Sequence, residues 1–340
     1  VRLVRGLGGH GLAAVFGGQG AGPRTLVRCE LDALPISERA GEPDPSMTAG
    51  VSHRCGHDGH MAIVAALAGM LSEEPPARGT ATLLFQPAEE TGAGARLVLD
   101  DPAFSALMPD TVFALHNVPG YAEGSVLLRD GVFASTARSL RVVLEGRTSH
   151  AAEPEKGLSP APALAKVLES WPSAPGEVAA PDEPALVTVV HARLGEEALG
   201  TSPGIAVAVA TLRAQSSSVM DRLAWRCLEI AEEHGRSYGL NVRAEWLEEF
   251  PCTESDSAAN AVVQRAAEEE GLPVVRLERP FTWTEDFGHF TDAFAGAMFG
   301  LGAGEDTPPL HHPDYAFPDG LIQKGSRLLR RVLDLVAEAD

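Results

Sequence analysis

Apolar runs that end in polar side chains alternate with a helix-forming segment in the first third of the chain. Thr25 to Asp32, Thr80 to Gln86 and Thr111 to His116 are such runs. Continuous apolar runs of this length, bounded by turn residues, predict buried strands. Residues 59–72 are nearly all apolar and rich in helix formers, which predicts a helix covered on several sides. Strands that alternate with helices indicate an α/β sheet.

A different order of elements follows in the middle of the chain. Strands are predicted at residues 138–145, 185–194, 204–213 and 241–248, with helices at residues 160–171 and 218–237. This βαββαβ order is typical of a split βαβ module in which the helices cover one face of an antiparallel sheet. The proline-rich residues 172–184 predict a surface loop inside the module. We expect residues 128–248 to form an inserted, ferredoxin-like α+β domain that acts as a lid.

The α/β pattern resumes after about residue 249. A helix is predicted from Asn260 to Glu270, a strand from Phe294 to Leu301, and a final helix over roughly residues 319–338. A chain of 340 residues exceeds the ~250–300 residues at which a single core stops growing. We therefore expect two domains, with residues 1–127 and 249–340 forming the α/β domain that carries the chemistry.

Composition and charge are those of a folded protein that does not bind nucleic acids or membranes. Hydrophobic residues make up 44% and charged residues 22% of the chain, which argues against disorder. The formal net charge of -20 would repel nucleic acids and anionic membrane surfaces. No apolar stretch approaches the ~18 residues of a spanning helix. The four cysteines show no disulfide spacing, so we expect a cytoplasmic protein.

Four short polar clusters contain the candidate chemistry. They are Cys55-Gly56-His57-Asp58-Gly59-His60, Glu89-Glu90, His116-Asn117 and His311-His312. Thiolates, imidazoles and carboxylates are the donors that divalent cations such as zinc, manganese or cobalt accept. Asp32 and the second and third clusters follow predicted strands, and ligands gather beyond the carboxyl ends of strands in open α/β sheets. The scatter of the clusters along the chain favours an open, catalytic metal site over a closed structural one.

Simpler explanations compete at several of these positions. Glu89-Glu90 taken alone would be a solvated charge pair, and His116 taken alone would be a hydrogen-bonded histidine that closes a strand. His312 adjoins His311 and could exchange roles with it. Three thiols are expected to be small core residues, namely Cys29, Cys227 and Cys252.

Taken together, these segments resemble the M20 metallopeptidase clan, specifically its amidohydrolase branch of hippurate hydrolases, aminoacylases and auxin-conjugate hydrolases. The matching segments are Glu30-Leu31-Asp32-Ala33-Leu34-Pro35-Ile36, Cys55 to His60, Phe85-Gln86-Pro87-Ala88-Glu89-Glu90, Ala114-Leu115-His116-Asn117, Ser149-His150-Ala151-Ala152, Thr284-Glu285-Asp286-Phe287 and Leu310-His311. They occur in family order, and such a collinear set is far more specific than any single motif. The resemblance implies a catalytic α/β domain of the zinc-peptidase, phosphorylase/hydrolase-like type, with the inserted domain serving as lid and dimerisation domain.

Carried over residue by residue, the resemblance implies a set of roles. Two divalent metal ions, Zn²⁺, Mn²⁺ or Co²⁺, would be bound by Cys55, His57, Glu90, His116 and His311. Glu89 would be the general base, and Asp32 and Asp58 would orient the ligand histidines. His150 would stabilise the oxyanion, commonly in the site of the partner subunit. The resemblance also implies that Arg213 and Asn117 contact the substrate.

Two features depart from the family pattern. Relatives often have Asn-x-x-Pro before the strand that ends in the arginine, but Gly200 occupies the asparagine position here. The substrate contact expected from that asparagine is therefore not carried over. The chain also begins with Gly-rich, strand-like sequence where relatives begin with a packed helical segment. We therefore expect a missing N-terminal segment or an alternative start, with apolar surface left exposed.

The resemblance predicts a cytoplasmic, metal-dependent amidohydrolase that cleaves N-acyl amino acids or related conjugates and forms a homodimer through the lid. A dipeptidase or carboxypeptidase of the same clan is the alternative within hydrolases. The alternative from another class is a non-catalytic, truncated relative that serves as a binding scaffold for a metal or an amino acid. Neither a nucleic acid nor a membrane is expected as a partner.

Overall fold

The chain divides into two compact units in the computed structural model, which describes residues 1–39 and 44–339. The first unit comprises Val1–Ala134, Thr253–Phe281 and Glu285–Asp340. The second comprises Ser135–Cys252 and Thr282–Thr284. The second unit is therefore an insertion in the first, and its action as a lid or in dimerisation stays a prediction.

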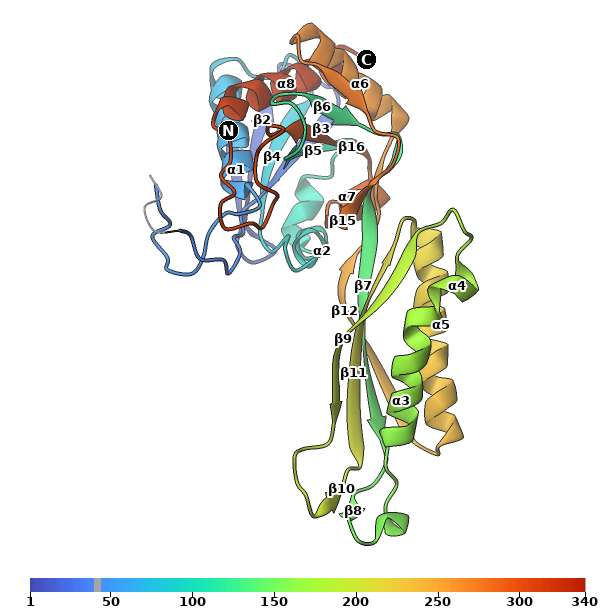
Figure 1. Cartoon of the computed structure of the whole chain (residues 1–340). Coiled ribbons are helices and arrows are strands. Elements are labelled where there is room, and N and C mark those ends of the chain that lie inside the picture. The colour runs from blue at the N-terminus through green and yellow to red at the C-terminus, as the bar shows by residue number, and fades with distance from the viewer. Residues whose placement is uncertain (40–43, 340) are drawn as a thin grey trace. The chain divides into compact units, whose positions relative to one another are not determined.

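A mixed eight-stranded sheet forms the centre of the first unit, in the order β1-β2-β4-β3-β5-β16-β6-β14 (Figure 1). Its central strands run parallel and are β3 (Arg24–Glu30), β4 (Thr80–Gln86), β5 (Thr111–Val118) and β16 (Ala295–Gly302). The flanking strands are β1 (Arg2–Leu7), β2 (Gly11–Gly17), β6 (Val126–Leu128) and β14 (Val274–Arg276). The predicted α/β sheet is confirmed, and β3 and β5 are buried along most of their length, as parallel central strands require.

Helices cover both faces of this sheet (Figure 1). One face carries α1 (His57–Glu73), α6 (Ser257–Glu269) and α8 (Gly320–Glu338), and the other carries α2 (Gly94–Leu99) and α7 (Gly288–Ala293). The core lies between the sheet and the first group of helices, where Ile63 and Leu67 of α1 meet Leu328 and Val332 of α8. The composition of α1 predicted cover on several sides, but Ala65 and Gly69 are exposed, so a stripe of this helix faces solvent.

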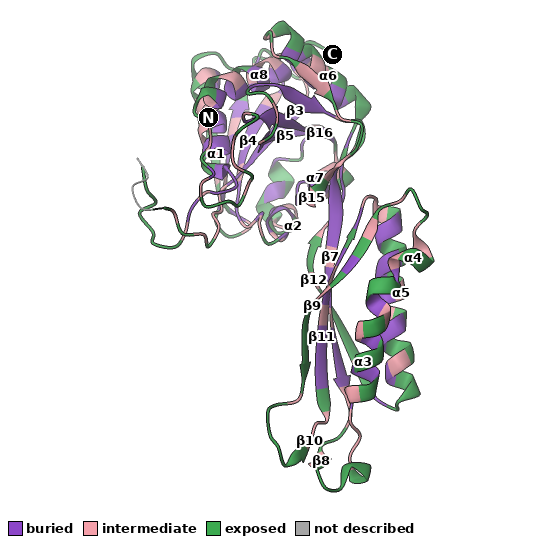
Figure 2. Ribbon diagram, in the orientation of Figure 1, coloured by how far each residue is buried: buried purple, intermediate pink, exposed green. Residues whose placement is uncertain are grey.

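Four antiparallel strands of a six-stranded sheet, in the order β12-β7-β11-β9, form the second unit together with two longer helices. The elements are β7 (Gly131–Glu145), α3 (Ala161–Ser170), β9 (Ala185–Leu194), β11 (Ile205–Ala214), α5 (Ser217–Ser237) and β12 (Asn241–Phe250). This is the predicted βαββαβ order. Alternate residues of β11, such as Ala208 and Leu212, are buried under α3 and α5. Figure 2 shows that both helices have buried residues among exposed ones.

The proline-rich segment 172–184 differs from its prediction as a surface loop. It begins within a 3₁₀ turn at Trp171–Ser173 and contains the short helix α4 (Pro175–Val178). Proline is well tolerated in the first turn of a helix because it needs no N–H donor there. Trp171 is fully buried, and its indole nitrogen donates to the Cys227 carbonyl at 2.9 Å, which anchors the segment to α5.

Several short elements had no clear signal in the sequence. They are the 3₁₀ turns Pro102–Ala106 and Pro154–Lys156 and the strands β8 (Ser149–His150), β10 (Thr201–Ser202), β13 (Thr253–Ser255) and β15 (Phe281–Thr284). Runs this short lack the periodicity from which strands are predicted.

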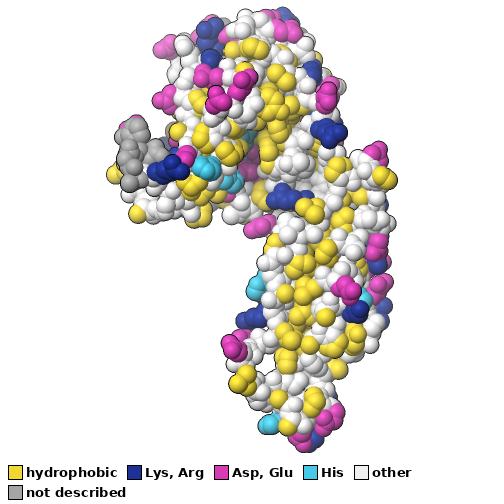
Figure 3. Space-filling view, viewed as in Figure 1, with side chains coloured by type: hydrophobic (Ala, Val, Ile, Leu, Met, Phe, Trp, Pro, Cys, Tyr) yellow, Lys and Arg dark blue, Asp and Glu magenta, His cyan; other side chains and the backbone are white. Residues whose placement is uncertain are grey.

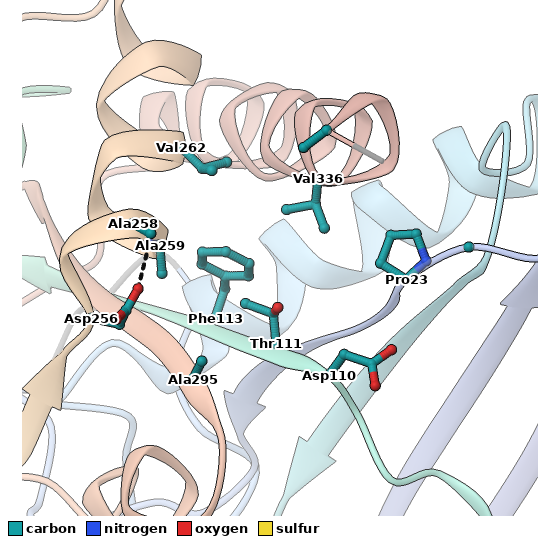
Figure 4. Close-up of a pocket in the computed structure, with 12 residues that line it drawn as sticks. Pro23, Asp110, Thr111, Phe113, Asp256, Ala258, Ala259, Val262, Ala295 and Val336 are labelled. Carbon is teal, nitrogen blue, oxygen red and sulfur yellow. Dashed lines mark hydrogen bonds between the residues drawn. The ribbon is translucent and has the colours of Figure 1, made fainter.

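A pocket of about 410 Å³ lies in the first unit at the amino-terminal ends of the parallel strands (Figure 4). Thr111 and Ala295, the first residues of β5 and β16, line it together with the apolar side chains of Val262 and Val336. Asp256, also at its wall, caps α6 by accepting from Ala259 N at 2.9 Å. The polar clusters of the sequence follow the opposite ends of the strands.

The surface carries mixed charge. On the face in Figure 3, basic side chains lie singly among acidic ones, in keeping with 27 Lys and Arg against 47 Asp and Glu in the whole chain. Among the described helices, none is both long and apolar enough to cross a membrane.

The packing of α1 on the core predicts a large loss of stability for Leu67→Ala. Leu67 is fully buried, so the truncation removes apolar contacts and leaves a cavity, and we expect the free energy of unfolding to fall by about 2–5 kcal/mol. Leu97→Ala is the matched control, because Leu97 in the same unit is 49% exposed and should change it by about 0.5 kcal/mol or less. Urea denaturation monitored by circular dichroism measures both. Equal losses in the two variants would contradict the packing described for α1.

Candidate metal centre

The polar clusters converge where the parallel strands end. His116 and Asn117 belong to the last part of β5, Glu89 and Glu90 follow β4 after a short turn, and Asp32 lies just beyond β3. Because neighbouring parallel strands end at the same edge of a sheet, these segments are brought together although they are distant in sequence. Cys55 precedes α1, whose first residue is His57.

Five donors from four separate segments approach one another closely. Cys55 Sγ lies 3.6 Å from His116 Nε2, and Glu90 Oε1 lies 4.0 Å from His57 Nε2 and 3.5 Å from His311 Nε2. Their possible ligand atoms form overlapping groups in which all atoms lie within 4.8 Å of one another. These groups are Cys55 with His57 and His116, Cys55 with Glu90 and His311, and His57 with Glu89 and Glu90.

Two atoms at the centre of this cluster indicate that a cation fits there. Within the described part of the chain, His57 Nε2 and Glu90 Oε1 are buried and have no hydrogen-bond partner. Leaving a buried polar atom without a partner is costly, so such atoms usually mark a missing ion or ligand. Imidazole, carboxylate and thiolate together suit zinc, manganese or cobalt. The residues therefore fit a pair of divalent metal ions.

The protonation states of two donors depend on their burial. Burial and the neighbouring His60 lower the pKa of His116 to about 3, so its imidazole is neutral and has a lone pair to give. Burial, reinforced by Glu90 and Glu89, holds the pKa of the Cys55 thiol well above its usual range. A thiol in such surroundings becomes a thiolate when it coordinates a metal ion, because the cation replaces the proton.

Asp32 contacts two of the residues that carry these donors. Its carbonyl oxygen lies 2.9 Å from His57 Nδ1, and its carboxylate oxygen Oδ2 accepts from Glu90 N at 2.9 Å. The contact with Nδ1 leaves Nε2 of His57 as the free ring nitrogen. Burial alone would lower the pKa of His57, but the Asp32 carboxylate and Glu30 raise it to about 9. Asp32 therefore has the placement expected of a residue that orients a ligand.

A buried guanidinium lies behind the cluster. Arg28 of β3 is fully buried and forms ion pairs with Glu30, with Glu285 at 2.8 Å and with Asp286 at 2.5 Å. Its Nε donates to Gln86 at 2.9 Å. Burial opposes its charge, but the surrounding carboxylates raise the pKa of Arg28 well above its usual value.

Arg28 connects this network to the candidate ligands along two routes. Glu30 Oε2 lies 2.6 Å from His60 Nδ1, and His60 Nε2 accepts from the backbone nitrogen of Asn117 at 3.1 Å. On the other side Asp286 accepts from Gln86 and from Ala95 N, while its own backbone nitrogen donates to Glu89 Oε1 at 3.4 Å. The arginine therefore braces the segments that carry His116 and Glu89.

Sequence analysis did not identify Arg28, Glu30 or Asp286 as a unit. One signal was present, because Arg28 is a charged residue inside the otherwise apolar run that became β3. A fully buried arginine requires buried anionic partners, but the sequence does not show which carboxylates supply them.

Glu89 has the surroundings of a proton acceptor. It is buried, and burial together with Glu285 and Asp286 raises its pKa well above the usual value, with Arg28 acting in the opposite direction. Ala88, the residue before it, has a positive φ of 58°, a backbone conformation that is uncommon for residues other than glycine. This turn sets the direction in which the chain delivers the two glutamates.

The remaining predicted residues differ in their surroundings. Asp58 is exposed and accepts from its neighbour Gly59 N, whereas Asn117 is fully buried and donates to Tyr315 Oη at 2.5 Å. His312 interacts with Asp314, at 3.7 Å, and belongs to none of the groups of candidate ligands. His150 and Arg213 lie in the second unit, exposed on β8 and β11, and their roles stay predictions.

The three thiols expected in the core are buried there. Cys29 and Cys227 are part of the two hydrophobic cores, and Cys252 is fully buried. All four cysteines are free thiols.

Known proteins resemble this chain over nearly its whole length. The model of peptidase family M20/M25/M40 matches residues 26–335. An N-acetyl-L-cysteine deacetylase of Bacillus subtilis (strain 168) is 31% identical over 331 residues, which cover 95% of this chain and 78% of the relative. An N-acetyldiaminopimelate deacetylase of Lacticaseibacillus casei (strain BL23) is 28% identical over 312 residues, covering 90% and 81%.

Solved structures share the fold. A putative aminohydrolase from methicillin-resistant Staphylococcus aureus superposes with a TM-score of 0.90 at 21% identity, covering 99% of this chain and 87% of that one. A Bacillus subtilis protein described as a dinuclear metal binding peptidase of the M20 family gives a TM-score of 0.82 at 23% identity, covering 100% and 88%.

The network predicts that Arg28→Met destabilises the protein strongly. Removing the guanidinium leaves buried carboxylates without a counter-charge, and we expect the free energy of unfolding to fall by about 3–5 kcal/mol. Arg24→Met is the matched control on the same strand, because the Arg24–Asp110 ion pair is exposed and screened by solvent, so a much smaller change is expected. Urea denaturation of metal-free protein measures both variants. Similar losses at the two positions would contradict the bracing role of Arg28.

Proposed function

Because the chain belongs to peptidase family M20/M25/M40, we propose that it is a metal-dependent amidohydrolase that cleaves the amide bond of N-acyl amino acids or related conjugates. The observation that carries the proposal is the convergence of five donors around His57 Nε2 and Glu90 Oε1, two buried atoms without hydrogen-bond partners. The names of the relatives support the substrate class, since several are deacetylases of N-acetylated amino acids.

The proposed ligands of two divalent ions, Zn²⁺, Mn²⁺ or Co²⁺, are Cys55, His57, Glu90, His116 and His311. When bound, such ions polarise the scissile carbonyl and lower the pKa of a bound water. His311 is preferred to His312 because His311 Nε2 lies 3.5 Å from Glu90 Oε1, whereas His312 interacts with Asp314. Asp32 would fix the orientation of His57 through the contact with Nδ1.

Glu89 is the proposed general base. Its carboxylate would take a proton from the attacking water and later deliver it to the nitrogen of the leaving amine, as the C–N bond breaks and a carboxylic acid is released. The donation from Asp286 N to Glu89 Oε1 would keep one oxygen in place and leave the other for the proton. A raised pKa, caused by burial and by Glu285 and Asp286, suits a group that must both accept and return a proton.

Two residues of the second unit complete the proposal. His150 would donate to the negative charge that develops on the scissile carbonyl oxygen. Arg213 would pair with the carboxylate of the substrate, for which a guanidinium is well suited because it can form two parallel hydrogen bonds. Both side chains are exposed on their strands, as groups that meet an external ligand must be. Homodimerisation through this unit, with His150 acting in the site of the partner subunit, belongs to the same proposal.

Glu89→Gln tests the proposed base. We expect turnover to fall by roughly 10²–10⁴-fold because the amide cannot accept a proton, while metal content and melting temperature stay close to those of the parent protein. The assay follows hydrolysis of hippurate, N-acetyl amino acids and dipeptides by metal-free protein with and without added Mn²⁺ or Zn²⁺. Glu268→Gln, on the exposed face of α6, is the matched control and should retain full activity.

Each outcome of this assay has a distinct meaning. Turnover of dipeptides alone would replace the amidohydrolase assignment with a dipeptidase. Folded protein that takes up metal and hydrolyses nothing on the panel would favour a binding scaffold. Full activity in Glu89→Gln would exclude Glu89 as the base.

His150→Ala tests the role of the second unit. Loss of an oxyanion donor should lower turnover by roughly 10²–10³-fold, and the melting temperature should not change because the side chain is exposed. If His150 acts in the partner's site, mixing His150→Ala with Glu89→Gln under conditions of subunit exchange should restore part of the activity, since mixed dimers then contain one intact site. A strict monomer by light scattering, or no recovery in the mixture of a proven dimer, would contradict action across subunits.

A further inference from the structure

His311 lies outside any helix or strand, so regular secondary structure does not fix its position. His311 lies in the loop between β16, which ends at Gly302, and α8, which begins at Gly320. Its φ of 64° is in the left-handed region, and its side chain is 51% exposed. This conformation is uncommon for residues other than glycine, and surrounding contacts help to hold it. The contacts that hold the loop therefore determine where this donor lies.

Arg54 holds the loop at two points. Its carbonyl oxygen accepts from His311 N at 2.7 Å, and its guanidinium donates to the carbonyl oxygen of Tyr315. Arg54 is itself buried and directly precedes Cys55. The loop is thus attached next to another candidate ligand.

Tyr315 forms the second attachment. Its side chain is fully buried, and its hydroxyl oxygen accepts from Asn117 Nδ2 at 2.5 Å. Asn117 directly follows His116, and its backbone nitrogen is held by His60 at 3.1 Å. The Tyr315 hydroxyl therefore joins the His311 loop to the end of β5 beside a third candidate ligand.

Gly56 shows how closely these segments approach. It has a φ of 88°, and a Cβ atom added there would lie 2.5 Å from Asn117 Oδ1. Only glycine fits at this point, so the segment before α1 lies against Asn117 with no room for adjustment. The three segments that carry Cys55, His116 and His311 are consequently joined by residues adjacent in sequence to the ligands or close to them.

We propose that Tyr315 is a positioning residue for metal binding. Its hydroxyl, bound to Asn117, sets the place of His311, while Arg54 fixes the loop through its carbonyl oxygen and through the guanidinium that donates to the Tyr315 carbonyl. This inference rests on the metal centre of the proposed function and adds a residue that belongs to none of the groups of candidate ligands. Groups that orient ligands in this way commonly change metal affinity by about 10–100-fold when removed. Only one of two ions should be affected, because His311 groups with Cys55 and Glu90 but not with His116.

The test is the binding of Mn²⁺ or Zn²⁺ to metal-free protein by isothermal titration calorimetry, with competing chelator for tight sites. Tyr315→Phe keeps the ring in the core and removes only the hydroxyl. We expect two ions to bind the parent protein, and one of them to bind Tyr315→Phe about 10–100-fold more weakly. Tyr238→Phe is the matched control, since Tyr238 lies in the second unit and is 38% exposed, and it should bind both ions as the parent does.

A double-mutant cycle with His311→Ala separates positioning from general loosening of the core. If Tyr315 acts through His311, adding Tyr315→Phe to His311→Ala should cause no further loss of affinity, because the group it positions is already absent. The same loss in both backgrounds, or unchanged affinity in Tyr315→Phe, would overturn the proposal. A parent protein that binds no metal would instead overturn the proposed function.

Arg54→Lys is a second variant that tests the positioning of His311 if Tyr315→Phe does not fold. Lysine retains the positive charge but shortens the reach to the Tyr315 carbonyl, so the loop is held less firmly. The ion whose ligand group contains His311 should again lose affinity, and the loss should again vanish in the His311→Ala background. Unchanged affinity for both ions in a folded Arg54→Lys would overturn the proposal.

Discussion

Arg28 is a positive charge enclosed within the sheet of the first unit, and the arrangement of the candidate site depends on it. Its guanidinium pairs with Glu30 on its own strand and with Glu285 and Asp286 on a segment far along the chain. A buried arginine is tolerated only when its partners are held in good geometry, so this charge fixes the ends of β3 and β4 relative to the turn before α7. Through Glu30 and His60 the same charge reaches the end of β5.

One guanidinium does not balance the carboxylates around it. Glu89 and Glu90 add to the three acids that Arg28 pairs with, and burial together with Glu285 raises the pKa of Asp286 to about 7 even though Arg28 opposes the shift. Such an excess of buried acid is costly unless protons or cations compensate for it. Divalent ions bound beside His57 and Glu90 would supply that charge. The acidic network and the proposed metal ions therefore stabilise each other.

The sequence predicted the parts of the site that depend on strand ends. Central parallel strands are continuous apolar runs. The polar residues that follow Gln86, and those in the last part of β5, were therefore predicted as candidate site residues. Arg28 was not, because it interrupts an apolar run and its partners come from a distant segment. The different contacts of His311 and His312 were not predictable either, since adjacent residues differ only in the contacts that their loop makes. The helix α4 was missed because prolines that suggest a loop also fit a first helical turn.

Titration of metal-free protein with Co²⁺ tests whether Cys55 and its neighbours bind two divalent ions. Cobalt bound to a thiolate gives a charge-transfer absorption in the near ultraviolet, so the spectrum reports both the stoichiometry and the participation of a cysteine. If Cys55 is a ligand in a two-metal centre, binding should saturate at two ions per chain, and the thiolate band should be lost in Cys55→Ser but persist in Cys252→Ser. Absence of saturable binding, or a thiolate band that persists in Cys55→Ser, would contradict the account.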